Sequence, residues 1–168
     1  MREKFKPLKG FEKQYEVSSF GRIKSLERPW VKQDFFLTPS ITQNGYAVVS
    51  LWDNGRFKPM NYIHRLVAEH FMSNEDNKPC INHKDGNKQN NHLYNLEWCT
   101  YSDNMKHAYC IGLRKLKLTI DQISEIRMRY ASGEESFYTL SKDYPVSKST
   151  IRRIVHKKYY WENKPKMQ

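Results

Sequence analysis

Short runs of strand-forming residues, separated by turn signals, make up the first part of the chain. Residues 46–52 are rich in strand formers, and the Asp53-Asn54-Gly55 turn that follows them is a strong hairpin signal. The pattern therefore predicts a small antiparallel sheet over residues 10–63. Its strands are expected at 15–18, 22–26, 46–52 and 57–63.

From Ile63 the hydrophobic period becomes helical. Ile63, Leu66, Val67 and Phe71 recur at i, i+3, i+4 and i+8, which is typical of one face of a short helix. Arg65 falls on the outer side of that helix. The sequence thus predicts a change from sheet to helix at this point.

Residues 80–110 have the pattern of a hairpin followed by a helix. A strand over 80–82 runs into a polar loop, and a second strand is expected over 96–99. Thr100 or Ser102 would then cap a helix that ends near Cys110. The unit is ββα, and its expected core consists of Ile81, Leu93, Leu96, Trp98 and Met105.

The C-terminal third predicts three short helices. Thr119 and Gln122 have the spacing of a capping box at the start of the first helix, which would end at Gly133. The other two are expected over 136–143 and 148–156. Their lengths and spacing resemble a helix-turn-helix, with Ile151, Ile154 and Val155 as the buried stripe of the last helix.

Charge favours a nucleic acid as partner. The 168 residues include 29 Lys or Arg and 18 Asp or Glu, a net charge of +11. Clustered cations bind a polyanion such as DNA favourably, because binding releases the counterions condensed on it. Residues 114–168 hold +7 of that charge. No apolar run approaches the ~20 residues of a membrane span, and no secretory signal is visible. These features predict a cytoplasmic protein, with no membrane or protein partner implied.

Candidate chemistry gathers in the ββα unit. Hydrolysis of a phosphodiester needs a base for water and a hard cation with oxygen ligands. His83 has the residue type of the base, and the side-chain oxygens of Asn82 and Asn104 could hold Mg²⁺, or alternatively Mn²⁺. On residue types alone, a histidine among asparagines is equally an ordinary feature of a polar loop.

A longer motif adds a resemblance. The run Ile-Asn-His-Lys-Asp-Gly-Asn-Lys from Ile81, with Asn91-His92, Asn95-Leu96-Glu97-Trp98-Cys99-Thr100, Asn104 and Lys106-His107-Ala108, resembles the HNH endonucleases. The likeness is to the homing type found in phage introns and free-standing in phage genomes. Residues 63–68 resemble the helix that precedes the hairpin in that group, and residues 5–28 resemble its small N-terminal module.

The resemblance implies a ββα-metal fold, also called a His-Me finger, and a role for each matching residue. His83 falls on the general base, Asn95 on the asparagine that braces the loop and orients the histidine, and Asn104 on the last metal ligand. Related enzymes often have Asp where this chain has Asn82, so one negative charge is missing from the metal site. His107 could be a further ligand, contact the phosphate, or be a surface residue.

Candidate DNA contacts come from two places. The exposed face of the last helix carries basic and polar residues that could meet the major groove or its phosphates, and the alternative is a basic solvated face on an ordinary helical bundle. Lys84 directly follows His83 in the sequence, and Arg65 lies in the helix expected before the hairpin. The last helix contributes Lys148, Ser149, Arg152, Arg153 and His156.

Together these observations predict an α+β protein. An HNH domain over 1–113, with a sheet module at 5–62 and the helix plus ββα core at 63–110, would be joined by a basic linker at 114–118 to a helix-turn-helix at 119–168. The expected function is metal-dependent, site-directed cleavage of double-stranded DNA that leaves 5′-phosphate and 3′-hydroxyl ends. The alternative is a DNA-binding regulator that keeps the fold without catalysis.

Overall fold

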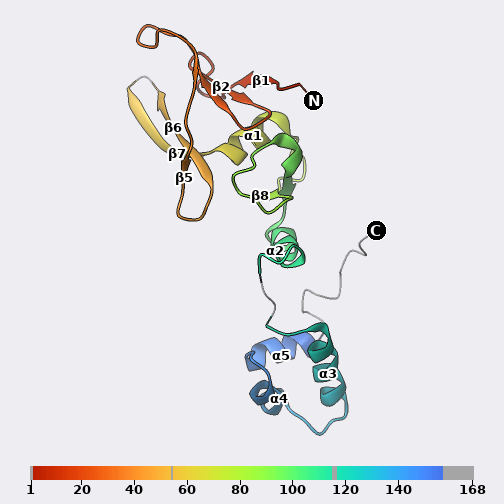
Figure 1. Cartoon of the computed structure of the whole chain (residues 1–168). Coiled ribbons are helices and arrows are strands. Elements are labelled where there is room, and N and C mark those ends of the chain that lie inside the picture. The colour runs from red at the N-terminus through yellow and green to blue at the C-terminus, as the bar shows by residue number, and fades with distance from the viewer. Residues whose placement is uncertain (1, 54, 115–116, 157–168) are drawn as a thin grey trace. The chain divides into compact units, whose positions relative to one another are not determined.

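The structure, a computed structural model, describes residues 2–53, 55–114 and 117–156 (Figure 1). The chain forms two compact units, Met1–Ile111 and Gly112–Gln168. Residues 115–116 of the expected linker and 157–168 of the expected helix-turn-helix domain lie outside the described residues.

Two separate antiparallel sheets build the first part of the N-terminal unit, where the sequence predicted one. The first has the strand order β1-β2-β3-β4, and the second has the order β5-β6-β7, in which β6 and β7 form a long hairpin (Figure 1). The expected single sheet is wrong because β4 pairs only with β3 and β5 pairs only with β6. The strands are β1 Phe5–Pro7, β2 Tyr15–Ser18, β3 Ile23–Ser25, β4 Phe35–Phe36, β5 Ser40–Ile41, β6 Ala47–Asp53 and β7 Arg56–Tyr62.

The helical period at Ile63 gives a helix, α1 Ile63–Phe71, which buries Ile63, Val67 and Ala68. The ββα unit follows as predicted, with Thr100 as the helix cap, because its side chain accepts a hydrogen bond from the Asp103 backbone N–H at 3.1 Å. Its elements are β8 Cys80–His83, the 3-10 helix Leu93–Asn95, β9 Leu96–Cys99 and α2 Tyr101–Cys110.

One hydrophobic core joins the sheet module to the ββα unit. Val17 of β2, Val67 of α1 and Leu96 of β9 belong to the same buried cluster, as does Ile81. Leu93 and Trp98 pack against this cluster and are partly buried. Met105 was expected in the core and is 38% exposed, so that prediction is wrong. Buried contact between α2 and the core is limited, because no residue of α2 is buried.

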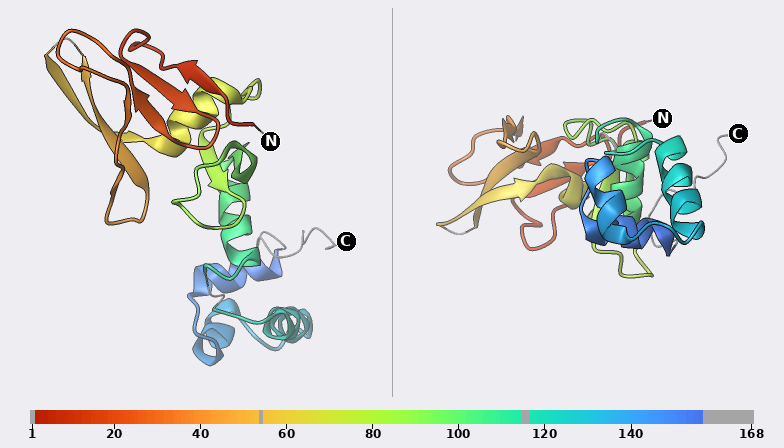
Figure 2. Two further views of the ribbon diagram at one scale, coloured as in Figure 1. Left: turned by 45° about the horizontal axis from the view of Figure 1, so that its top comes forward. Right: turned by 90° about the horizontal axis from the view of Figure 1, so that it is seen from below.

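The C-terminal unit is a three-helix helix-turn-helix (Figure 2). Its helices are α3 Ile120–Ala131, α4 Phe137–Asp143 and α5 Lys148–Val155. The predicted capping box is present, with the Thr119 side chain and Gln122 each bonded to the other's backbone N–H. A separate core holds the helices together, formed by Leu118, Ile123, Ile126, Leu140, Tyr144, Ile151 and Ile154.

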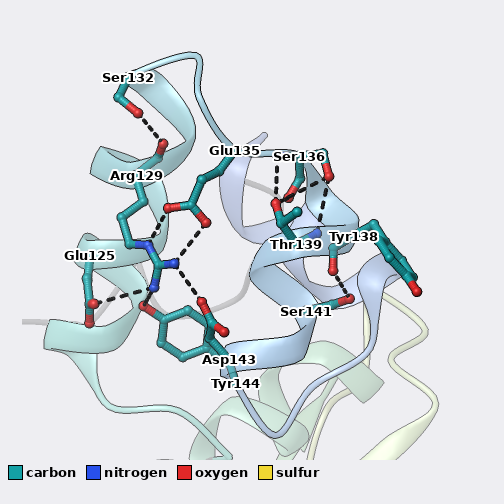
Figure 3. A network of polar contacts seen from close by, with 10 residues as sticks. All are labelled: Glu125, Arg129, Ser132, Glu135, Ser136, Tyr138, Thr139, Ser141, Asp143 and Tyr144. Atoms are coloured by element: carbon teal, nitrogen blue, oxygen red, sulfur yellow. Dashed lines mark hydrogen bonds and ion pairs between the residues drawn. The ribbon is translucent and has the colours of Figure 1, made fainter.

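A polar network around Arg129 ties α3 to α4 (Figure 3). The guanidinium donates two hydrogen bonds to Glu135, at 2.6 and 2.8 Å, and one to Asp143 at 2.6 Å. It also lies 3.4 Å from the Tyr144 hydroxyl and forms a longer ion pair with Glu125. Three carboxylates therefore surround this one cation, which makes Arg129 a structural residue of the unit.

No helix in the described parts of the chain is both long and apolar enough to cross a membrane.

Candidate active site

His83 lies at the end of β8 and is buried. Its Nε2 is 3.2 Å from Oδ1 of Asn91, and the Asn91 amide nitrogen in turn donates to the Gln89 carbonyl at 3.1 Å. Because an amide oxygen can only accept a hydrogen bond, Nε2 of His83 is the nitrogen that carries the hydrogen. This leaves the lone pair of Nδ1 as the basic site.

The surroundings of His83 favour the neutral imidazole. Burial lowers its pKa below the ordinary 6.5, and this effect outweighs the hydrogen bond with Asn91 and the charge of Asp85, which act in the opposite direction. A neutral imidazole at working pH is the form that can accept a proton.

Two rings from other parts of the chain lie beside the histidine. The ring centroid of His64, in α1, is 5.2 Å from that of His83 in an edge-on arrangement, and that of Tyr46 is 6.2 Å away. Burial and the neighbouring His83 lower the pKa of His64 to about 4. Its Nδ1 is buried and has no hydrogen-bond partner among the described residues. Both rings therefore pack against the His83 imidazole.

Asn95 holds the loop that connects β8 to β9. Its side-chain oxygen accepts from the Asp85 backbone N–H at 3.0 Å, and its amide nitrogen donates to the Asp85 carboxylate and the Asn90 carbonyl, both at 2.8 Å. It thus fixes the residue next to Asn91. The direct partner of His83 is Asn91, whose side-chain oxygen accepts the Nε2 hydrogen, and Asn95 contributes by holding the loop.

Asn82 is buried beside a carboxylate. Its amide nitrogen donates to Oε1 of Glu97 at 2.7 Å, from the position directly opposite on β9. The planar amide then directs its oxygen away from Glu97. Asn82 therefore has an oxygen to offer to a ligand.

Asn104 and His107 lie one turn apart on α2, and both are half-buried. α2 packs against β8, the strand that ends in Asn82 and His83. In the residues that the structure describes, no three His, Cys, Asp or Glu side chains gather as a metal cluster. The candidate donors are instead two amide oxygens with a carboxylate adjoining one of them, and oxygen donors of this kind suit a hard cation such as Mg²⁺.

The sheet module reaches this site through the turn between β2 and β3. A Cβ atom at Gly21 would lie 2.8 Å from Cβ of Asn91, and Gly21 has a positive φ of 82°. The Leu93 backbone N–H donates to the Ser19 carbonyl at 2.9 Å, and the rings of Phe20 and His92 lie 4.3 Å apart. The N-terminal module is therefore part of the support for the partner of His83.

Comparison with known proteins agrees with this geometry. Residues 61–106 match the family described as HNH endonuclease, and residues 3–52 match the NUMOD4 motif. DNA endonuclease I-HmuI of Bacillus phage SP01 is 32% identical over 150 residues, which cover 89% of this chain and 82% of that protein. The chain belongs to the HNH homing endonucleases.

Two further relatives extend the comparison. An uncharacterized HNH endonuclease, L245, of Acanthamoeba polyphaga mimivirus is 32% identical over 157 residues, and the chain spans only 43% of its length. The solved structure of I-HmuI, which concerns DNA binding and cleavage by that homing endonuclease, has a TM-score of 0.58 and 32% identity. The match covers 75% of this chain and 67% of the I-HmuI chain.

The candidate DNA-binding residues of this family member are exposed. Lys84 donates to the Tyr94 carbonyl at 2.9 Å, and Arg65 donates to the Pro79 carbonyl at 3.3 Å. On α5, Ser149 and Arg153 lie on the face opposite the buried stripe, flanked by Lys148 and Arg152, and His156 is the C-cap residue; all five are exposed. The His156 ring also contacts Phe137 of α4, at 5.9 Å between centroids.

Sequence reasoning assigned no role to Asn91, Glu97 or Gly21. Asn91 stands in the motif, but its residue type does not reveal which asparagine bonds the histidine. Glu97 could have been found from the hairpin register, which pairs it with Asn82 once the strands are aligned. No signal in the sequence indicates that Gly21 meets a residue 70 positions later.

Proposed function

We propose that the chain is a metal-dependent, site-directed endonuclease that hydrolyses phosphodiester bonds of double-stranded DNA with His83 as general base. The observation that carries the proposal is the hydrogen bond from His83 Nε2 to Asn91, which leaves Nδ1 as the base. Membership of the family and the net charge of +11 support DNA as the substrate.

In the proposed reaction, Nδ1 of His83 takes a proton from water as the water oxygen attacks the phosphorus. The bond from phosphorus to the 3′ oxygen breaks, and that oxygen takes a proton from water, so the two fragments of the cut strand end in a 3′-hydroxyl and a 5′-phosphate. The two rings and Asn91 hold the imidazole in place for this transfer. General-base catalysis of this kind is worth about 10²–10⁴ in rate.

Asn82 and Asn104 are the proposed metal ligands, with His107 as a third candidate one turn further along α2. A bound Mg²⁺ or Mn²⁺ ion would supply positive charge to stabilise the phosphate and the leaving oxygen. The carboxylate of Glu97 beside Asn82 adds the charge that such an ion prefers.

Binding is assigned to the basic surfaces. Lys84 directly follows His83, Arg65 is exposed on α1, and α5 would read the major groove with its exposed face. We expect the protein to act in the cytoplasm, that of the host cell if the chain is phage-encoded.

The test is nicking of a supercoiled plasmid that contains the target, with Mg²⁺ and with EDTA. We expect cutting only with metal, and loss of cutting in His83→Ala with DNA binding retained. His70→Ala, which removes a histidine from the end of α1, is the matched control and should cut normally. Cutting at the normal rate by His83→Ala would refute the proposed base. Binding without cutting by the wild-type protein, with any divalent metal, would favour the non-catalytic regulator.

A further inference from the structure

We propose that Glu97 is a positioning residue of the metal site, which holds the amide of Asn82 and supplies the negative charge that this amide lacks. The inference rests on the proposed function, because it assumes that Asn82 is a metal ligand. It assigns a role to a strand residue outside the proposed set of ligands.

The hairpin register brings the two residues together. In the antiparallel pairing of β8 with β9, Asn82 and Glu97 are direct partners, so their side chains emerge on the same face. The amide nitrogen of Asn82 lies 2.7 Å from Oε1 of Glu97. Asn82 is 5% exposed, and Glu97 is half-buried. A hydrogen bond to a carboxylate at this depth is stronger than one between neutral groups.

This hydrogen bond decides which end of the amide faces the site. With its nitrogen directed at Glu97, Asn82 can present only its oxygen elsewhere. The amide oxygen is the donor that a hard cation accepts, whereas the nitrogen is not. Groups that hold a ligand in this way commonly affect metal affinity by about 10–100-fold when they are changed.

The charges of the unit single out the same residue. Residues 80–110 contain three carboxylates, Asp85, Glu97 and Asp103. Asp85 accepts hydrogen bonds from within the loop, and Asp103 is bonded to the helix cap Thr100. Glu97 accepts a hydrogen bond from Asn82, and none of the proposed metal ligands carries a negative charge of its own. It is therefore the carboxylate whose charge acts most directly on a cation at Asn82.

The test measures Mn²⁺ binding to the full chain without DNA, by the loss of the free-ion signal in electron paramagnetic resonance. Glu97→Gln removes the charge but keeps an oxygen that can accept from Asn82. We expect it to weaken Mn²⁺ binding about tenfold, the lower end for residues that hold a ligand. Glu69→Gln removes the same charge from the exposed side of α1 and should bind Mn²⁺ as the wild-type protein does.

A double variant separates charge from shape. Asn82→Asp combined with Glu97→Gln moves the single negative charge across the hydrogen bond and keeps a donor and an acceptor facing each other. We expect this variant to recover Mn²⁺ affinity close to that of the wild-type protein. Recovery also shows that loss in the single variant is not a folding defect.

Two results would overturn the proposal: unchanged Mn²⁺ affinity in Glu97→Gln, or failure of the double variant to recover it. Asn104→Ala distinguishes this failure from failure of the proposed function. If Asn104→Ala weakens Mn²⁺ binding while Glu97→Gln does not, the metal site stands and only the role of Glu97 is lost. The nicking experiment with His83→Ala tests the catalytic proposal independently.

Discussion

The imidazole of His83 has two nitrogens that could accept a proton, and a single neighbour distinguishes them. Asn91 accepts the Nε2 hydrogen, so Nδ1 is the nitrogen that the proposed function assigns as the base. Asn91 is itself in contact with Gly21, from a turn far earlier in the chain. At the scale of single residues, the base therefore depends on a glycine in the N-terminal module.

Substitution of Gly21 by Ala should slow cleavage. A Cβ at this position would lie 2.8 Å from Cβ and 3.0 Å from the carbonyl oxygen of Asn91, so Asn91 must shift. A displacement of a catalytic group by a fraction of an ångström to an ångström can cost roughly 10–100-fold in rate. We expect single-turnover cleavage to slow by about this factor, with DNA affinity changed much less.

Gly10→Ala is the control for this prediction. Gly10 has a nearly identical φ of 79°, but a Cβ there would meet nothing within 4 Å. Both variants should lose about 1–2 kcal/mol of stability from the left-handed backbone, and only Gly21→Ala should lose cleavage rate. Equal cleavage by the two variants would remove the link from Gly21 to His83.

His64 should make the N-terminal unit sensitive to acid. Its pKa is lowered from 6.5 to about 4 by burial and by the nearby His83, so the unfolded chain binds a proton between these values and the folded chain does not. Stability must then fall as the pH falls through that window. From pH 7 to pH 5 the loss is about 2 kcal/mol in the free energy of unfolding.

Urea unfolding followed by tryptophan fluorescence at the two pH values measures this loss. His64→Phe keeps a ring among Tyr46 and Tyr62 and removes the titrating group. The variant should lose less stability than the wild-type protein over the same pH range. An equal loss in both proteins would show that other groups cause the acid sensitivity.

Roles could be predicted from the sequence only for residues that match a position of the family motif. His83, Asn82, Asn95 and Asn104 were assigned from their positions in the motif, and these assignments stay predictions. The hydrogen bond from His83 to Asn91 could not be predicted, because the loop holds several asparagines that could accept it, and only the folded loop determines which one does.

Secondary-structure elements with several hydrophobic repeats were predicted well. α1 and the three C-terminal helices follow the expected periods and caps. β1, β4 and β5 have two or three residues and show no detectable alternation, so they were missed. β3 is as short, but the turn at Gly21 marks where it begins, and it was predicted. Met105 was wrongly placed in the core, because α2 has no buried residue and its apolar positions do not indicate a packed face.

On α5, two basic residues should contribute differently to DNA binding. Arg153 lies on the exposed face, where a guanidinium can bond a guanine edge, and Lys148 lies at the helix start, where it can meet a phosphate. We expect Arg153→Ala to weaken the free energy of binding to the target sequence by about 1–3 kcal/mol and to change binding to random DNA little. Lys148→Ala should weaken binding to both and flatten its salt dependence.

Binding curves for target and random duplexes at several salt concentrations measure both effects. If the two variants lose the same affinity for each duplex, α5 does not read the groove. The result would then favour a basic solvated face on an ordinary helical bundle.

At the scale of the whole molecule, the N-terminal module and the ββα unit are one folded body. The sequence analysis placed both in one domain, 1–113, with the two parts meeting at 62–63, and the family matches leave a gap between 52 and 61. One core contains side chains from both sides of this boundary, from Leu8 to Leu96. Local sequence patterns mark where the two parts meet, but they do not show which side chains pack across the boundary, because these contacts join residues far apart in the sequence.

The second unit, in contrast, has a core of its own, from Leu118 to Ile154. The unit boundary lies after Ile111, and residues 114–168 carry +7 of the net charge of +11. A chain of residues 1–113 should therefore fold, with a cooperative melting transition. It keeps the whole proposed catalytic site but lacks most of the charge that attracts DNA.

We expect this shortened chain to nick DNA in a metal-dependent way, with lower affinity and poorer choice of site. Affinity should fall most at low salt, because fewer counterions are released when fewer phosphates are neutralised. Cleavage of a target plasmid and of a plasmid without the target, across a salt series, measures affinity and selectivity together. Site selectivity equal to that of the full chain would place sequence recognition in residues 1–113, and the helix-turn-helix would then contribute only charge.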